Sequence, residues 1–296
     1  MSEEKKGVRG FLGNIFFPVT ATLEFLQKYF KGIILLLLIL VLIGAMQKEA
    51  VQKPNLITIK LTGAILNPDK VLKQIEEAQK PNYKGVLFVI DSPGGAVAPS
   101  IEISRAIKRL RQKKPVVVYA AGTLASGSYY SAIWSNKIIA NPGAIVGSIG
   151  VIFETPMIKG LLDKIGVEPQ VVKAGKYKEV GTPFRPWKEY EKEEIKKVIQ
   201  NTYEMFVKEV CQARGLKYEE KEKFADAHIF TAVQAKEVGL VDEVGTIEKA
   251  KKETQKLAKV KKAIWKKPSK LEEMLQELSE QTSSKLASLL LGHKLF

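Results

Sequence analysis

The sequence predicts an α/β fold in which parallel strands alternate with helices. From residue 55 to about residue 245, short apolar runs typical of strands alternate with longer stretches of helical periodicity. One run, GVLFVI between Lys84 and Asp91, is continuously apolar, as expected for a strand covered on both faces of a sheet. Of the 296 residues, 45% are hydrophobic and 27% are charged, which suffices for a packed core and excludes a globally disordered chain.

The predicted elements follow one another in a regular order. Strands are predicted at residues 55–61, 84–91, 115–120, 137–140, 144–152 and 169–173. Helices are predicted at residues 68–79, after residue 95 to about 113, from about residue 125, at 156–165 and at 187–214. Residues 271–296 form a further amphipathic stretch that is appended to this pattern. The alternation favours helices packed against a parallel sheet.

An apolar stretch near the N-terminus predicts a membrane anchor. Residues 33–46 read IILLLLILVLIGAM and carry no charge. At a rise of 1.5 Å per residue they span only about 21 Å, but counting from Tyr29, with Lys28 and Lys31 reaching the interface, gives about 27 Å. We therefore expect a transmembrane helix at residues 29–46, preceded by a cytoplasmic or interfacial segment at residues 1–28.

A cleaved signal peptide and a buried core helix are the alternatives. About thirty residues precede the run, and no small-x-small site follows it. The run also lacks the polar face of a core helix. More basic residues precede the span than follow it closely, which favours a cytoplasmic N-terminus and an extracytoplasmic main domain in a single-pass protein of the cell (inner) membrane.

The net charge of +15 is concentrated near the C-terminus. Residues 249–270 hold ten lysines and one acid, Glu253. Nucleic-acid binding is disfavoured because this segment contains no arginine and one aromatic residue, Trp265. A solvated basic helix and linker, or attraction to an anionic membrane surface, remain open.

Familiar catalytic templates are absent. Cys211 is the only cysteine, so no intramolecular disulfide framework forms, and a multi-histidine metal centre is not expected with only His228 and His293. Neither GxxxxGK[ST] nor GxSxG occurs. Neither histidine lies in a glycine-rich setting, which disfavours a serine–histidine–aspartate triad. No metal or cofactor is expected.

Three glycine-rich segments carry the candidate chemistry. DSPGG at residues 91–95 ends a predicted buried strand, where backbone N–H groups unobstructed by side chains could bind an oxyanion. AGTLASGSYY at residues 121–130 places Ser126 among small residues at a predicted helix start. AGKYKEVG at residues 174–181 carries two lysines, and composition alone does not choose between Lys176 and Lys178.

Together the motifs resemble the signal peptide peptidase A family of membrane-anchored serine proteases. The resemblance rests on DSPGG, LASGSYY, GSIGV (147–151) and AGKYKEVGTPFRP (174–186), in that order behind an apolar segment, and FTAVQAKEVGLVDEVG (230–245) is also similar. It covers about residues 55–250. It implies a Clp protease/crotonase-like spiral of strand-strand-helix units, with a Ser-Lys protease domain at 55–250 and a basic linker and amphipathic tail at 251–296.

The resemblance also implies roles for individual residues. Ser126 matches the nucleophile, Lys178 the general base, and Ser148 the serine that orients the lysine. Gly94 or Gly95, together with Gly127, would form the oxyanion hole. The chain departs from the family at Ser128, where a second glycine is usual, and this side chain is expected to crowd the cleft slightly.

A Ser-Lys mechanism sets physical requirements. A free lysine has a pKa near 10.4 and must be desolvated to act as a base at neutral pH. Ser126 and Lys178 are far apart in the sequence, so folding or a neighbouring subunit must bring them together. Half-length members of the family assemble into rings, which implies a homo-oligomer here, an octamer or a tetramer. Hydrophobic peptides, such as remnant signal peptides, are the implied substrates.

Other functions remain open at this stage. A related membrane protease acting on stomatin-like proteins shares DxPGG and a Ser-Lys dyad. A crotonase-like acyl-CoA-binding enzyme would leave Ser126 and Lys178 without roles, and an inactive scaffold would only oligomerise. The tail at 271–296 either docks on a neighbouring subunit or its catalytic groove, or is a membrane-surface or disordered segment.

Overall fold

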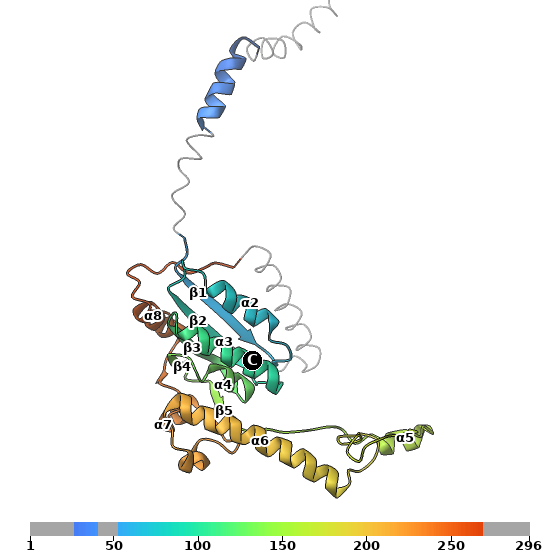
Figure 1. The fold of residues 1–296 in the computed structure, drawn as a ribbon. Helices are drawn as coiled ribbons and strands as arrows, with labels where there is room; N and C mark the ends of the chain where they lie inside the picture. The colour runs from blue at the N-terminus through green and yellow to red at the C-terminus, as the bar shows by residue number, and fades with distance from the viewer. Residues whose placement is uncertain (1–26, 41–52, 269–296) are drawn as a thin grey trace, which may run out of the picture. The chain divides into compact units, whose positions relative to one another are not determined.

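The computed structural model describes residues 27–40 and 53–268 (Figure 1). The chain divides into two compact units, Met1–Lys53 and Pro54–Phe296. In the first unit, residues 27–40 are helical and almost all are exposed. No helix within the described ranges is both long and apolar enough to cross a membrane. Residues 41–46 of the predicted span at 29–46 lie outside the described residues. The whole predicted stretch at 271–296 lies outside them too.

The second unit is built on a seven-stranded sheet in the described part of the chain. Its strands are β1 (Leu56–Thr62), β2 (Gly85–Ser92), β3 (Val116–Ala125), β4 (Lys137–Ala140), β5 (Ile145–Gly147), β6 (Ile229–Thr231) and β7 (Glu243–Val244). The order β1-β2-β3-β4-β7 is parallel throughout, and β5 pairs parallel with β3 and antiparallel with β6. The predicted α/β fold is confirmed, as a mixed sheet.

Both faces of the sheet are covered. On β2, Phe88 joins a large core with the helices α2 (Asp69–Ala78), α3 (Val97–Arg111), α4 (Gly127–Ala132) and α6 (Glu189–Arg214), whereas Leu87 joins a smaller core on the other face. The smaller core contains Ala250 of α8 (Ile247–Leu257) and packs against Trp265. Successive residues of a strand face opposite sides, so a strand buried on both faces has no polar alternation.

Strand β3 positions the candidate site. Its first half pairs with β4 through residues 117–120, and its second half pairs with β5 through residues 123–125. It therefore runs five residues beyond its predicted end at residue 120. The carboxyl ends of β2, β3 and β5 meet at one region of the sheet, where they lead into the DSPGG turn, the Ser126 turn and the Ser148 turn.

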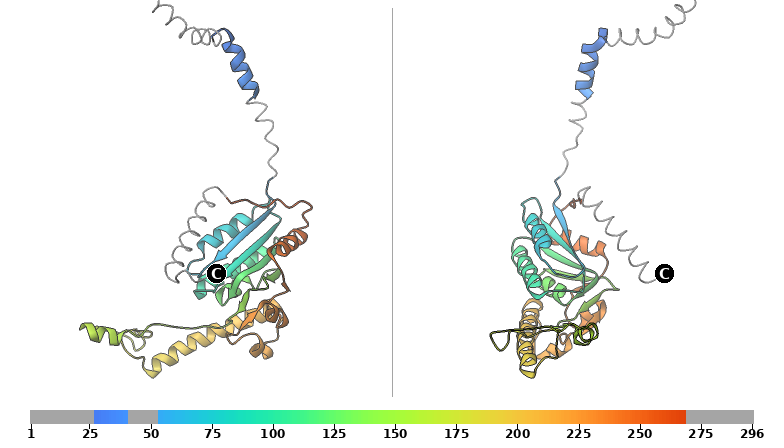
Figure 2. Two further views of the ribbon diagram at one scale, coloured as in Figure 1. Left: turned by 180° about the vertical axis from the view of Figure 1, so that it is seen from behind. Right: turned by 90° about the vertical axis from the view of Figure 1, so that its right-hand side faces the viewer.

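Residues 152–187 form an arm beside the N-terminal end of α6. The short helix α5 (Lys159–Ile165) in this arm has no buried residue and lies well away from the sheet (Figures 1 and 2). The predicted strand at 169–173 is wrong. Val171 and Val172 are 53% and 103% exposed, and a β-prone run does not form a strand without a neighbour to pair with. The predicted strand at 144–152 ends at Gly147, where two residues with positive φ turn the chain.

Three more helical elements belong to the described part of the second unit. They are a 3₁₀ helix (Tyr218–Lys223), α7 (Ala232–Glu237) and α8. The predicted domain boundary at residue 250 falls inside α8, where Ala250 and Thr254 are buried. Beyond α8, the amide of Asn55 donates to the carbonyl of Ile264 (2.8 Å), so the lysine-rich segment is held at the start of β1.

Candidate active site

Ser126 lies at a sharp turn between β3 and α4. Its backbone has φ 53° and ψ −125°, a conformation that is costly for a residue with a side chain. The turn is held by two hydrogen bonds, in which the Ser126 amide donates to the carbonyl of Gly147 (2.8 Å) and its carbonyl accepts from the amide of Tyr130 (3.0 Å). Strain of this kind is characteristic of functional turns, and it leaves the Ser126 hydroxyl half-buried at a pocket mouth.

Two backbone amides that have no partner in the described ranges lie next to this turn. The N–H groups of Gly95 and Gly127 have no acceptor among the described residues, whereas Gly94 donates to the Oγ of Ser92 (3.2 Å). A Cβ built on Gly94 would lie 2.6 Å from the nitrogen of Gly127, so the two glycine turns are in close contact. The carbonyl of Gly94 accepts from the amide of Ile65 (2.8 Å), which fixes its turn. The geometry favours Gly95, with Gly127, as the pair of free donors.

The expected crowding by Ser128 is wrong. This side chain is fully buried and lines neither of the pockets described below. Its Oγ accepts from the amide of Ala125 (2.9 Å) and donates to the carbonyl of Ser92 (2.6 Å). Ser128 therefore ties the end of β2 to the end of β3 beneath the turn, next to the register shift between these two strands.

Ser126 borders two pockets. The first has a volume of ≈ 100 Å³ and is mainly apolar, with Val97, Ile101, Val151, Ile152, Met205 and Phe206 among its lining residues. The second has a volume of ≈ 320 Å³ and is more polar, with Ser148, Gln200, Tyr203 and Asp226 in its lining. Helix α6 contributes to both. Sequence analysis did not identify these α6 residues, because helical periodicity does not distinguish a pocket wall from a core face.

Ser148 lies at a second strained turn. It follows β5, has φ 50°, and its amide donates to the carbonyl of His228 (2.7 Å). It lines the larger pocket together with Ser126. The structure thus brings together Ser126, Ser148 and the two free amides, which come from the ends of three strands.

Lys178 is not part of this cluster. Its side chain is exposed, and it lines neither pocket. The neighbouring Tyr177 ring packs on Tyr190 in the first turn of α6 (5.6 Å between centroids), whereas Thr202 of α6 lines the pocket at Ser126. Twelve residues of helix separate Tyr190 from Thr202, which is about 18 Å at 1.5 Å per residue. Within one chain, Lys178 therefore lies far from Ser126.

Lys176 and Lys178 differ in their surroundings. The Lys176 ammonium lies over the rings of Tyr177 and Tyr190, 5.3 and 4.8 Å from their centroids. The described residues offer the Lys178 ammonium no partner.

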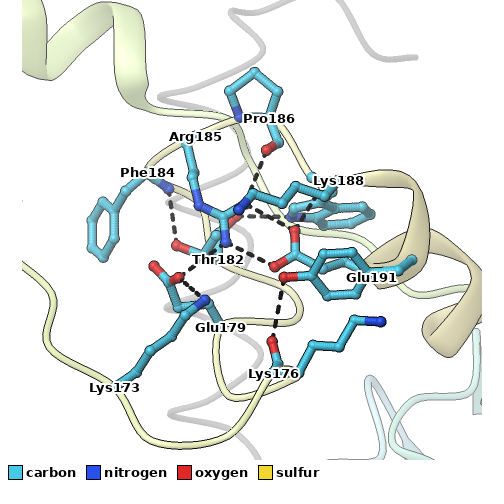
Figure 3. A network of polar contacts seen from close by, with 11 residues as sticks. Lys173, Lys176, Glu179, Thr182, Phe184, Arg185, Pro186, Lys188 and Glu191 are labelled. Atoms are coloured by element: carbon cyan, nitrogen blue, oxygen red, sulfur yellow. Dashed lines mark hydrogen bonds and ion pairs between the residues drawn. The ribbon is translucent and has the colours of Figure 1, made fainter.

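A charged network joins the loop at residues 174–181, here called the lysine loop, to α6 (Figure 3). Arg185 donates from Nη1 and Nη2 to the two carboxylate oxygens of Glu191 (2.8 and 2.7 Å) and from Nη2 to Glu179 (3.1 Å). Lys173 pairs with the same Oε2 oxygen of Glu179. The side chain of Glu191 is fully shielded from solvent, and hydrogen bonds from Arg185 and the Lys188 amide lower its pKa to about 2.

The same contacts act on the other members of this network. Lys173 and then Arg185 lower the pKa of Glu179, and Glu191 and Glu179 raise that of Arg185. Within the described residues no cluster of three or more His, Cys, Asp or Glu could hold a metal ion.

Comparison with known proteins identifies relatives that are proteases by name. The chain is 47% identical over 179 residues to a candidate protease of Methanocaldococcus jannaschii, covering 60% of this chain and 58% of that protein. It is 40% identical over 202 residues to a candidate protease of Synechocystis, covering 68% of this chain and 73% of that protein. It is 35% identical over 187 residues to a candidate signal peptide peptidase SppA of Enterococcus faecium, covering 62% and 54%.

The matched region thus spans little more than half of the first and third of these relatives. Among solved structures, a membrane-bound stomatin-specific protease 1510-N in complex with a substrate peptide superposes with a TM-score of 0.51. That superposition covers 78% of this chain and 100% of the other, and at 17% identity it shows the shared fold.

Residues 108–261, more than half of the chain, match the description "Peptidase family S49". The matched range includes both strained serines and the lysine loop. The chain therefore belongs to peptidase family S49, the family of signal peptide peptidase SppA.

Proposed function

We propose that this chain is a serine endopeptidase in which Ser126 is the nucleophile. The observation that carries the proposal is the strained Ser126 turn, which borders an apolar pocket together with Gly95 and Gly127, whose amides have no acceptor in the described part of the chain. The hydroxyl attacks a peptide carbonyl bound across the pocket mouth. The two amides donate to the oxygen as it becomes negatively charged, which is where preformed donors lower the barrier most.

The general base of this reaction is Lys178. The lysine takes the Ser126 proton during attack and returns it to the leaving amine, so that an acyl-enzyme remains on Ser126. Water then attacks the acyl carbonyl with the same lysine acting as base, the ester bond to the Ser126 oxygen breaks, and the lysine returns the proton to that oxygen as the acid product leaves. Ser148 lines the larger pocket and orients the lysine by a hydrogen bond.

A neighbouring copy supplies Lys178 to each site. From Tyr190, which contacts the loop of Lys178, to Ile199, the first α6 residue in the larger pocket, the helix rises by about 14 Å, which is longer than a lysine side chain. The larger pocket beside Ser126 has room for an incoming ammonium among Ser148, Tyr203 and Asp226. Closing the pocket over the lysine removes water and disfavours its charged form.

The arm also carries exposed apolar side chains of the kind that subunit contacts bury: Ile152, Phe153, Met157, Leu161, Ile165, Val167, Val171 and Val172. This arrangement requires a homo-oligomer, and a closed ring satisfies it when each copy gives its lysine to one neighbour and receives a lysine from the other. A ring of this kind fits the Clp protease/crotonase-like spiral to which we assign the mixed sheet.

The substrates are apolar peptides presented near a membrane. The small pocket beside Ser126 accepts one apolar side chain of modest size. The apolar run at 29–46 anchors the protein in the inner membrane with the catalytic domain outside the cytoplasm.

The test is cleavage of an apolar peptide by the purified full chain and by three variants. Ser126→Ala and Lys178→Ala are each expected to lose activity, while Lys176→Ala retains it. Full activity in Ser126→Ala refutes the nucleophile, and loss confined to Lys176→Ala refutes the choice of base.

Co-expression of the two inactive variants tests the shared site. If serine and lysine come from different copies, about a quarter of the sites in mixed rings regain both groups. If both come from one copy, mixing restores nothing, and the shared site is refuted.

A further inference from the structure

The loop that carries Lys178 is fixed to α6 on both sides of the lysine. On one side, the Tyr190 hydroxyl donates to the carbonyl of Lys176 (3.3 Å), and the Tyr177 and Tyr190 rings meet edge to face. On the other side, Arg185 binds Glu179, the residue that follows Lys178. The exposed lysine therefore projects from a short segment with two anchors.

The second anchor depends on a fully shielded carboxylate. Glu191 is the third residue of α6 and accepts from the Lys188 amide (2.8 Å), so it is part of the helix start. It also accepts both parallel hydrogen bonds from Arg185, a geometry that a guanidinium provides and an ammonium does not. Glu191 thus binds Arg185, and Arg185 binds Glu179. Glu179 directly follows Lys178 in the chain.

The same helix lines the pockets along its middle turns. Residues Thr202, Tyr203 and Phe206 of α6 border the cavities at Ser126. A straight helix transmits position with little loss, because each turn is tied to the next by backbone hydrogen bonds. Helix α6 thus connects the pocket of one site with the lysine that serves the next.

We propose that Arg185 and Glu191 are positioning residues for Lys178. They hold the lysine loop at a fixed place on α6, so that the Lys178 ammonium enters the larger pocket of the neighbouring copy at a fixed distance from Ser126. This inference rests on the proposed function, since it acts through Lys178 and a second copy of the chain. Neither residue touches the substrate, so their loss should lower kcat and leave KM nearly unchanged.

The experiment measures kcat and KM of the full chain for an apolar peptide. Arg185→Ala is expected to lower kcat about 100-fold, the effect of displacing a catalytic group by about 1 Å. Arg185→Lys is expected to recover only part of this loss, because an ammonium cannot span both carboxylates. Combining Arg185→Ala with Lys178→Ala should lower kcat no further than Lys178→Ala alone, since residues that act as a unit are not additive.

Arg214→Ala is the matched control. Arg214 also makes a two-pronged pair, with Asp242 (2.8 and 3.2 Å), and it lies at the opposite end of α6 from the lysine loop. Its loss should lower the melting temperature without lowering kcat per folded enzyme. An equal loss of kcat in Arg214→Ala and Arg185→Ala would overturn the inference in favour of a general effect on folding.

Two further outcomes separate the inference from the proposed function. If Lys178→Ala is inactive and Arg185→Ala keeps kcat within twofold, the positioning role is overturned and the base assignment stands. If Lys178→Ala is active, the proposed function itself fails. Should Arg185→Ala not assemble, Glu179→Gln decides, because it weakens the anchor and leaves the Arg185–Glu191 pair in place, and an unchanged kcat in that variant overturns the role.

Discussion

A methyl group on Gly94 should disable the site without unfolding the protein. Gly94 has φ 98°, and an added Cβ would lie 2.6 Å from the nitrogen of Gly127 and 2.9 Å from the Cβ of Ser126. Ordinary contacts of a Cβ begin at 3.4 Å. The DSPGG turn and the Ser126 turn must therefore separate by about 0.8 Å, the difference between 3.4 and 2.6 Å.

That displacement sets the expected size of the effect. Moving a reacting group by about 1 Å costs on the order of 100-fold in rate. Removing one oxyanion donor costs about 100- to 1,000-fold, or about 2.7 to 4 kcal/mol. Gly94→Ala should therefore lower kcat/KM by about 100-fold. A non-glycine residue in the left-handed region also costs roughly 1–2 kcal/mol of folding stability.

Peptide cleavage and thermal unfolding, measured on the same preparations, separate these effects. Gly215→Ala is the matched control, because Gly215 also has a positive φ (68°) but nothing lies within 4 Å of its added Cβ. Both variants should melt at a lower temperature, and only Gly94→Ala should lose activity. If Gly94→Ala cleaves peptides within threefold of the unmodified chain, the contact between the two turns has no catalytic role.

Three further predictions concern the surroundings of the site. Ser148→Ala should lower kcat at least 10-fold with little change in KM, because it removes an orienting hydroxyl and leaves the apolar pocket intact; an unchanged kcat would exclude that role. Met205→Ala should enlarge the small pocket and shift preference about 10-fold toward bulkier side chains, as competition between two peptides would show. Hydrogen bonds from Lys137 and Lys249 lower the pKa of Glu243 to about 2, below its unfolded value, so this carboxylate stabilises the fold above about pH 4.5 and loses that effect as the pH falls toward 2. The melting temperature of Glu243→Gln should therefore lie below that of the unmodified chain at pH 7 and approach it at pH 3; a constant gap would contradict the linkage.

Local sequence was sufficient for most of the sheet. The apolar run after Lys84 is β2, and residues 137–140 are β4 as predicted, because a strand buried on both faces needs a continuous apolar stretch. The valines at 171 and 172 have the same local preference but form no strand. Their side chains have no sheet beside them, and strand formation depends on a partner that local composition does not specify.

Local sequence identifies the chemical groups that are available: a serine and glycines at strand ends, and a loop with two lysines. Their arrangement in space depends on the packing of distant segments. The Ser128 side chain points toward the ends of β2 and β3 and not into a pocket. The amide of Gly94 is paired, whereas that of Gly95 has no acceptor among the described residues. The loop of Lys178 contacts Tyr190, about a dozen helical residues from Thr202 in the small pocket at Ser126. These outcomes depend on backbone direction and on contacts between segments distant in the chain, because hydrogen bonds and sterics act between atoms that folding brings together.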